Sequence, residues 1–404
     1  MNKVSTINII ANAALGPFFS GGDNIFIKCA KRWAQMGHKI NIFVWEEGLE
    51  MCQRNYLTGV NYIIWPAARF KKFGFFILYF SRVIIGCMKS WKYHFKSPCI
   101  IYSASDFWPD SIPAFMMKIK NKKARWIAGF YLFAPKPWQK DSPYRGKRFL
   151  KGLFYWLMQL PTYWLVNKYA DMVFVTSEPD VRKFVTKKRN RNKIVVIRGG
   201  VDIKPSTEYP NSGNVIPVEK RKYDAVFVGR FHPQKGVLEL IDIWKLVCKK
   251  KPQAKLAMIG NGSLEKEVKE KIEKFGLQDN IESHGFRDRE EKYDIFKQSK
   301  IVLHPATYDS GGMAAAEAMA WGLPGVSFDL ESLKTYYPKG MIKVAQDDYG
   351  KFAEEIIKLL SDKDYYLKLS NEARNLIVKE WDWSVRAKYI YDCIIKNIGE
   401  KAIK

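Results

Sequence analysis

The sequence predicts an α/β protein of two doubly wound, parallel-sheet, Rossmann-like domains, and three observations lead to this fold class. The chain has 404 residues, 47% of them hydrophobic, which is enough for two domains with separate cores. Short apolar segments alternate with longer segments of helical periodicity, a pattern typical of parallel sheets. A second series of such segments starts at Asp224, so the unit occurs twice.

The first half opens with an apolar strand at Ile7–Ala11, a loop containing glycines and a helix from about Asp23 to Met36. This order is typical of the start of a Rossmann-like domain. The glycines do not follow the G-x-G-x-x-G pattern, so a plain turn is equally compatible with the loop. We expect the remaining strands of this half at 39–45, 60–65, 99–103, 124–130, 172–176 and 194–197.

The second half repeats the alternation after a stretch, 203–222, that has three prolines and no periodicity and that we interpret as the linker. A helical tail is expected from Tyr349 to Ile398, broken at Trp381–Trp383. The predicted divisions are 1–205, 206–380 and a C-terminal helical segment, 381–404. Strands of the second half are expected at 224–230, 255–262, 281–286, 299–304 and 325–329.

The net charge of +26 is concentrated in the first half of the chain. Residues 1–200 contain 33 Lys and Arg against 10 Asp and Glu, whereas residues 201–404 contain 34 against 31. The first half is therefore expected to face an anionic partner: membrane lipid, nucleic acid or a phosphorylated acceptor. Nucleic acid is disfavoured, because the cations are interleaved with long apolar runs and no RNP, KH or zinc-finger pattern is present.

Two segments of the first half combine aromatic rings with cations. Residues 71–89 and 147–166 are apolar, rich in Phe, Tyr and Trp, and edged by Lys and Arg. Such segments suit helices that lie in the surface of an anionic membrane, although both could also be core helices. We expect a cytoplasmic protein held peripherally at the inner face of the cell membrane.

Other classes of protein are disfavoured by the sequence. The six cysteines are scattered without C-x-x-C spacing, which predicts reduced thiols and neither a disulfide framework nor a zinc site. His and carboxylates do not fall at metal-ligand spacing, so no metal is expected. The beginning of the chain lacks a signal-peptide apolar region, and no uncharged apolar run reaches the length of a membrane-spanning helix.

The stretch 308–324 predicts a ligand-binding loop followed by a short helix. Ser310 is a candidate helix cap, Gly311 and Gly312 would allow a ligand to approach the backbone, and Glu317 lies in the middle of an Ala-rich helix. The flanking strands place this loop at the carboxyl edge of the second sheet, where ligands bind. Free N–H groups of Gly311, Gly312 and Met313 would favour an anion or sugar hydroxyls.

The turn after the first strand of the second half carries two cations, Arg230 and Lys235, with nothing acidic between them. Fixed cations at the start of a helix suit a diphosphate, although two solvated surface cations are the plainer interpretation. In the first half, Asp106 and Asp110 follow a strand. Either could accept the proton of an acceptor hydroxyl, or cap the helix expected near Pro109, and capping is the preferred interpretation.

The segment from Asp309 to Glu317 resembles the E-x7-E element of the retaining GT-B glycosyltransferases of family 4, with Asp309 in place of the first Glu. The turn from Arg230 to Lys235 is similar to the cationic turn of that family. The resemblance implies two domains facing a central cleft and transfer of a sugar, with retention, from a nucleoside-diphosphate sugar to a glycan acceptor that could be lipid-linked. It implies no cofactor.

The resemblance also implies roles for the candidate site residues. Glu317 would hold the ribose, Asp309 the donor sugar, and Arg230 and Lys235 the diphosphate, while the last helix would cross back to the first domain. Two departures are the Asp at 309 and the absence of His from 129–135. Together with Asp106 as a catalytic candidate, the donor-binding candidates are Gly21, Gly22, Gly229, Gly260, Gly285, Phe286, Ser310, Gly311, Gly312 and Met313.

Two other functions stay open. A non-catalytic GT-B subunit of a membrane glycosylation complex would account for both departures. A sugar-nucleotide epimerase would have the same architecture but would act on the donor without an acceptor.

Overall fold

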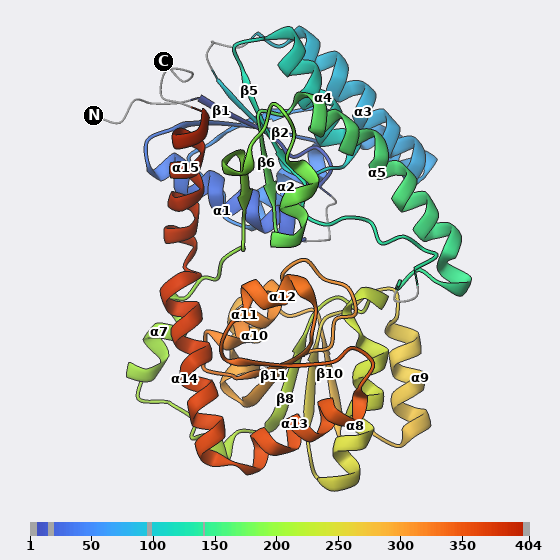
Figure 1. Cartoon of the computed structure of the whole chain (residues 1–404), viewed down its shortest axis with the longest axis vertical. Helices are drawn as coiled ribbons and strands as arrows, with labels where there is room; N and C mark the ends of the chain where they lie inside the picture. Colours follow the sequence, from blue (N-terminus) through green and yellow to red (C-terminus); the bar gives the residue numbers. More distant parts are fainter. Residues whose placement is uncertain (1–5, 15–19, 95–98, 140–141, 399–404) are drawn as a thin grey trace. The chain divides into compact units, whose positions relative to one another are not determined.

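The computed structural model describes residues 6–14, 20–94, 99–139 and 142–398. The chain forms two compact units, each built on one parallel β-sheet flanked by helices (Figure 1). The first unit comprises 1–136, 150–199 and 383–404, and the second comprises 137–149 and 200–382. The predicted fold class, two Rossmann-like parallel-sheet domains, is confirmed.

The sheet of the first unit has the strand order β3-β2-β1-β4-β5-β6-β7, with every neighbouring pair parallel. The chain starts in the middle of the sheet, builds one edge and returns to build the other, so the switch point lies between β1 and β4. The strands are β1 (Thr6–Ile10), β2 (Lys39–Val44), β3 (Asn61–Ile64), β4 (Ile100–Ser103), β5 (Arg125–Gly129), β6 (Met172–Val175) and β7 (Ile194–Val196).

Helices cover both faces of this sheet and enclose two apolar clusters. α1 (Gly21–Gln35), α2 (Glu46–Arg54) and α15 (Trp383–Ile398) enclose one cluster, and Trp33 Nε1 donates to the carbonyl of Ala387 at 2.9 Å, joining α1 to α15. Helices of the opposite cluster are α4 (Trp108–Lys120), α5 (Phe149–Tyr169) and α6 (Val181–Phe184). α3 (Phe75–Lys92) packs against α4, outside this layer.

The sheet of the second unit has the order β10-β9-β8-β11-β12-β13, and its switch point lies between β8 and β11. Its last strand was not predicted: Met341–Val344 is a four-residue edge strand whose two middle residues are half-buried, so its burial neither alternates nor is continuous. The strands are β8 (Tyr223–Val228), β9 (Leu256–Ile259), β10 (Ile281–Gly285), β11 (Ser299–His304), β12 (Gly325–Phe328) and β13 (Met341–Val344).

Helices again cover both faces. One apolar cluster lies beneath α8 (Val237–Lys250), α9 (Glu265–Phe275) and α13 (Tyr349–Ser361). The other lies beneath α10 (Arg289–Lys297), α11 (Met313–Met319), α12 (Glu331–Tyr336) and α14 (Lys363–Glu380). The stretch expected to be an irregular linker contains the short helix α7 (Lys204–Glu208).

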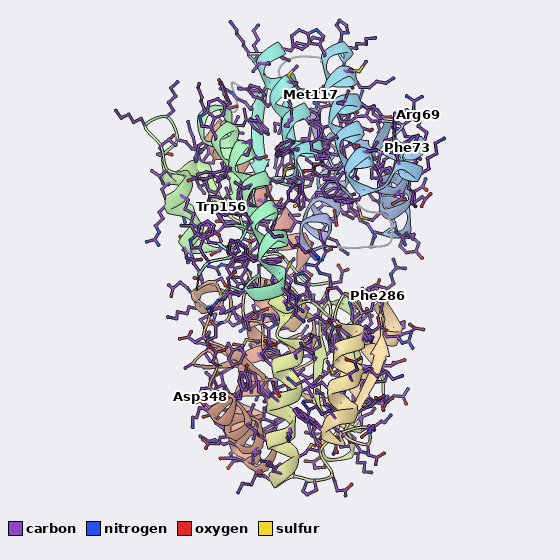
Figure 2. All side chains as sticks on the ribbon, turned by 90° about the vertical axis from the view of Figure 1, so that its right-hand side faces the viewer. Arg69, Phe73, Met117, Trp156, Phe286 and Asp348 are labelled. Atoms are coloured by element: carbon purple, nitrogen blue, oxygen red, sulfur yellow. The ribbon has the colours of Figure 1, made fainter. Side chains whose placement is uncertain are left out.

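No helix in the described ranges is both long and apolar enough to cross a membrane. Many large apolar side chains of the first unit are nevertheless exposed, and most belong to α3, α5 and the turns that precede them. Figure 2 faces this side of the molecule, with Phe73 just before α3 and Trp156 on α5.

Candidate active site

Two loops meet at the switch point of the second sheet, where adjacent strands β8 and β11 end. The backbone N–H groups of Thr307 and Tyr308 donate to the carbonyl of Gln234, at 3.1 and 3.2 Å. Gly236 has a φ of +63°, and a Cβ at this position would lie 1.8 Å from the carbonyl oxygen of Pro305. Glycine is therefore required for the two loops to approach so closely.

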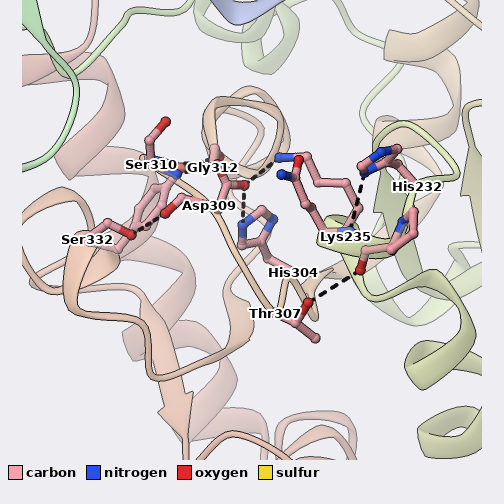
Figure 3. Close-up of polar contacts among 12 residues, drawn as sticks. His232, Lys235, His304, Thr307, Asp309, Ser310, Gly312 and Ser332 are labelled. Carbon is pink, nitrogen blue, oxygen red and sulfur yellow. Dashed lines mark hydrogen bonds and ion pairs between the residues drawn. The ribbon is translucent and has the colours of Figure 1, made fainter. Parts of the chain in front are cut away.

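An ion pair joins the two loops (Figure 3). The Nζ atom of Lys235 lies 2.6 Å from Oδ2 of Asp309, whose side chain is only 9% exposed. His304 Nε2 lies 3.2 Å from the same oxygen, although its alignment is poor for a hydrogen bond. The other carboxylate oxygen accepts from the N–H of Ser310 at 2.7 Å.

The charge of Asp309 is maintained by these neighbours. Burial by itself raises the pKa of Asp309, but attraction to Lys235 and interaction with His304 outweigh burial and hold the pKa well below its usual range. Both carboxylate oxygens thus have partners within the protein. The structure gives Asp309 a clear task, which is to fix the ammonium group of Lys235.

Arg230 is the second cation of this turn, and its side chain is exposed. Within the described part of the chain, its guanidinium group has no hydrogen bond or ion pair. Its charge acts on the nearby phenol of Tyr144, where burial raises the pKa and Arg230 opposes that rise. The N–H donors of Arg230 are therefore not used by partners in the described part of the chain.

Glu317 lies on α11 and forms an ion pair that the sequence did not reveal. Its Oε2 is 2.8 Å from Nζ of Lys292 on α10, and Lys292 also approaches Asp288 at 3.3 Å. Burial lowers the pKa of Lys292, but the charge and hydrogen bond of Glu317 prevail and raise it above its ordinary value. The Glu317 side chain is 28% exposed, so its ion pair with Lys292 does not cover it completely.

The start of α11 differs from the prediction. Ser310 was expected to cap this helix, but the N-cap is Gly312, in the left-handed region with a φ of +58°. A Cβ on Gly311 would lie 2.3 Å from the ring of Tyr336, and one on Gly312 would lie 2.8 Å from His304 Nε2. These glycines are therefore needed to accommodate the protein's own side chains. Met313 is the first residue of the helix.

The other glycines predicted for this unit pack against one another at the same edge of the sheet. The N–H of Gly260 donates to the carbonyl of Gly285 at 2.8 Å, and a Cβ on Gly260 would lie 1.9 Å from the carbonyl oxygen of Gly229. Phe286 follows β10 and its ring is 62% exposed (Figure 2). The edge thus combines tight backbone turns with one open aromatic surface.

The predicted capping role of Asp106 and Asp110 is wrong. The N-cap of α4 is Phe107, and no side chain caps this helix. Asp106 accepts a hydrogen bond from Gln159 Nε2 at 2.8 Å, and burial raises the pKa of Asp106 to about 6. Asp110 accepts from Ala13 N and Ser105 Oγ, at 2.7 and 2.6 Å, and burial raises the pKa of Asp110 to about 8.

The predicted glycines of the first unit lie in the first turn of α1, which begins at Gly21, two residues before the expected start. A reciprocal capping box between Ser20 and Asp23 holds this turn, with Ser20 N donating to Asp23 Oδ2 at 2.9 Å. A Cβ on Gly22 would lie 3.1 Å from the ring of Tyr131, so the second glycine makes room for that side chain.

Two residues that contact the candidate site residues of the second unit were not predicted from the sequence. Lys292 lies 25 positions before Glu317 on a different helix, and no local pattern links them. His304 was interpreted as a core residue, and it is buried, but it also supports Asp309. The structure brings Lys235, Asp309 and Ser310 together, while Asp106, Gly21 and Gly22 belong to the first unit. Among the described residues, no cluster of His, Cys, Asp or Glu could hold a metal ion.

Most of the second unit matches the model of a known protein family. Residues 211–376 match the family model for glycosyl transferases group 1. Poly(glycerol-phosphate) alpha-glucosyltransferase of Bacillus subtilis (strain 168) is 28% identical over 169 residues, which is 41% of this chain and 25% of that protein. An uncharacterized glycosyltransferase of Methanocaldococcus jannaschii is 28% identical over 280 residues, which is 66% of this chain and 64% of that protein. The chain thus spans less than two thirds of the length of these relatives.

A solved structure covers nearly the whole chain. HepE of Anabaena, crystallised with UDP and glucose, superimposes with a TM-score of 0.68 over 96% of this chain and 98% of that chain, at 15% identity. At this identity the likeness shows a common fold. Residues 211–376 are therefore similar to glycosyl transferases group 1, and the chain as a whole has the two-domain GT-B fold.

Proposed function

We propose that this glycosyltransferase moves a hexosyl group from a nucleoside-diphosphate sugar to a hydroxyl of a glycan acceptor, with retention at the anomeric carbon. The observation that carries the proposal is the cationic turn of the second unit. One of its cations, Arg230, is unpaired within the described residues, and the other, Lys235, is held in place by the buried Asp309.

The donor diphosphate binds between these two cations. An ammonium group has three donors, so Lys235 can donate to Asp309 and still offer two N–H bonds to phosphate oxygens. The fixed charges stabilise the negative charge that grows on the departing diphosphate as the sugar is transferred. We propose that these side chains meet that charge without a metal ion or another cofactor.

The remaining parts of the donor bind along the same edge of the sheet. Glu317 accepts hydrogen bonds from the ribose hydroxyls, and Lys292 fixes its orientation. The sugar lies against Ser310 and the Gly311–Met313 backbone, while the exposed ring of Phe286 stacks on the base. Gly229, Gly260 and Gly285 shape the floor: a Cβ on Gly260 would collide with the backbone of Gly229, a Cβ on Gly229 would lie 3.0 Å from the ring of Phe227, and Gly285 has a φ of +67°.

Transfer follows a same-face route. The bond between the anomeric carbon and the diphosphate oxygen breaks, the acceptor oxygen bonds to that carbon from the same face, and the acceptor proton passes to the released diphosphate. Asp106 of the first unit is the candidate that positions the acceptor hydroxyl, and its pKa of about 6 leaves it largely charged at neutral pH. Retention agrees with the name of the Bacillus subtilis relative, an alpha-glucosyltransferase.

We further propose that the acceptor is a lipid-linked glycan at the cytoplasmic face of the cell membrane. The proposal is tested by following the thermal stability of the purified protein with UDP-glucose, UDP-N-acetylglucosamine and GDP-mannose. The stabilising donor, with its sugar labelled, is then incubated with membrane extract. Labelled glycan is expected, and NMR of the new linkage should show the donor's anomeric configuration.

The same experiment separates the alternatives. An epimerase would convert the sugar nucleotide in the absence of extract, which product analysis detects. A non-catalytic subunit would transfer no sugar under any condition. Either result would overturn the proposed function.

A further inference from the structure

Helix α3 presents most of its large apolar side chains to the outside, while its buried face carries Arg82 and Ser90 as well as the apolar Leu78 and Val83. Leu78, Arg82, Gly86 and Ser90 recur every fourth residue and are buried. The opposite stripe, 40–59% exposed, recurs every third or fourth residue and consists of Ile77, Phe80, Ile84, Met88 and Trp91. This arrangement is the reverse of an ordinary surface helix, whose apolar stripe faces the core.

Helix α5 shows the same reversal. The buried residues are Gly152, Gln159, Thr162 and the apolar Val166, whereas an apolar stripe that is 41–77% exposed runs along the outside. That stripe consists of Leu150, Phe154, Leu157, Leu160 and Trp164. Two neighbouring helices with this reversal expose far more apolar surface than scattered single residues would.

The two helices form one continuous surface. The rings of Phe76 on α3 and Phe154 on α5 pack edge to face, with centroids 5.5 Å apart. Trp108 of α4 links the two helices. Its backbone N–H donates to the hydroxyl of Tyr79 on α3 at 3.0 Å, and its indole N–H donates to the carbonyl of Met158 on α5 at 2.7 Å. Figure 2 shows α3 and α5 on the same side of the first unit.

The charged side chains of this surface are cationic. Residues 68–92 and 150–169, which supply it, contain eight Lys and Arg and no Asp or Glu; of these cations Arg82 is buried, and Lys71 pairs with Glu47 at 2.6 Å. Lys72 lies over the ring of Phe73 at 5.0 Å, and Lys168 lies over the ring of Trp164 at 4.7 Å. Cations are therefore placed beside the exposed rings, as at the boundary between lipid tails and headgroups.

We infer that α3 and α5 form a docking surface for an anionic lipid bilayer, in which the two apolar stripes enter the acyl boundary and the Lys and Arg side chains contact phosphate headgroups. A second copy of the chain is a poorer occupant, because two surfaces rich in cations would repel each other. This inference does not depend on the transfer reaction, since binding to lipid can be measured without a donor.

The test is flotation of the full chain with vesicles of phosphatidylcholine alone and of phosphatidylcholine mixed with phosphatidylglycerol. The stripe variant is Ile77→Gln, Ile84→Gln and Met88→Gln. The control, Val185→Gln, Val215→Gln and Leu367→Gln, removes apolar side chains elsewhere that are 43–48% exposed, against 50–59% for the three stripe positions. A charge variant, Lys89→Gln, Lys92→Gln and Lys151→Gln, completes the set.

We expect the wild type and the control to float with the anionic vesicles and to be released by added salt. The charge variant should bind roughly 100-fold more weakly, at about fivefold for each cation lost. The stripe variant should remain at the bottom of the gradient with an unchanged circular dichroism spectrum.

Absence of wild-type binding to anionic vesicles would overturn the inference, as would equal losses in the stripe and control variants. A wild type that does not bind vesicles but sediments as a dimer, which the stripe variant converts to monomer, would assign the surface to a second copy of the chain.

Discussion

Removal of Lys235 should damage both stability and donor binding, and the structure shows how to separate the two effects. Lys235→Ala leaves Asp309 buried and charged, with His304 as its remaining partner. Breaking one side of a buried ion pair costs about 3–5 kcal/mol. Because Lys235 is itself 24% exposed, we expect about 3 kcal/mol, the lower end of that range.

A second substitution removes the cause of the instability. In the Lys235→Ala, Asp309→Asn double variant no uncompensated charge stays buried, so most of the lost free energy of unfolding should return. Affinity for the nucleotide should not return, because a charge-assisted hydrogen bond contributes about 1.5–3 kcal/mol, or more than tenfold in Kd. Turnover of Lys235→Ala should fall by about 10²–10³.

The assays are urea unfolding and calorimetric titration with UDP and GDP, and Lys300→Ala is the matched control. Lys300 is also 24% exposed and lies 2.7 Å from Asp224, which is more exposed than Asp309, at 20% against 9%. The control should lose less stability and keep its nucleotide affinity. Nucleotide affinity equal to wild type in the double variant would refute the assignment of Lys235 to the diphosphate.

Four further substitutions test other parts of the account. Glu317→Gln should weaken nucleotide binding at least tenfold by calorimetry, and Lys292→Met should do so less strongly, because it acts only through Glu317. Burial raises the pKa of Asp110 in the folded state to about 8, so the folded protein holds this proton more tightly than the unfolded chain does. The free energy of unfolding should therefore fall as pH rises from about 4 to 8, by up to about 1.4 kcal/mol per pH unit. Asp110→Asn should flatten this slope in urea titrations at several pH values. Gly260→Ala should lower the melting temperature sharply, because its Cβ would lie 1.9 Å from a backbone oxygen.

The sequence was most informative where a repeating pattern determines structure. Alternating strands and helices fixed the fold class, because period-two and period-3.6 burial can be read from residue type alone. The helix start at Gly312 could not be predicted, since a glycine with positive φ and a Ser three residues before the helix give similar signals. The edge strand Met341–Val344 was missed because Ile342 and Lys343 are only half-buried, so its burial neither alternates nor forms a continuous apolar run.

The site was predictable only in part, for a related reason. Arg230 and Lys235 stand out because they share one short turn, and Glu317 stands out because it is the single carboxylate of an Ala-rich helix. Their partners come from other elements: Asp309 reaches Lys235 across 74 positions, and Lys292 reaches Glu317 from α10. Such pairs depend on tertiary packing, which a single sequence does not display.

The exposed stripes of α3 and α5 show the reverse situation. Their aromatic and cationic composition was visible in the sequence, but a buried helix has a similar composition. Only the structure shows that Ile84 and Trp164 are exposed while Arg82 and Gln159 are buried.

The most direct test of the central claim is calorimetric titration of UDP-glucose, UDP-N-acetylglucosamine and GDP-mannose into the wild type and into Arg230→Met. Arg230 has no partner in the described part of the chain, so this change should leave unfolding free energy within about 0.5 kcal/mol of wild type. We expect at least one donor to bind the wild type and to bind Arg230→Met more than tenfold more weakly. Equal affinity in the two proteins, or no binding of any donor, would contradict the account.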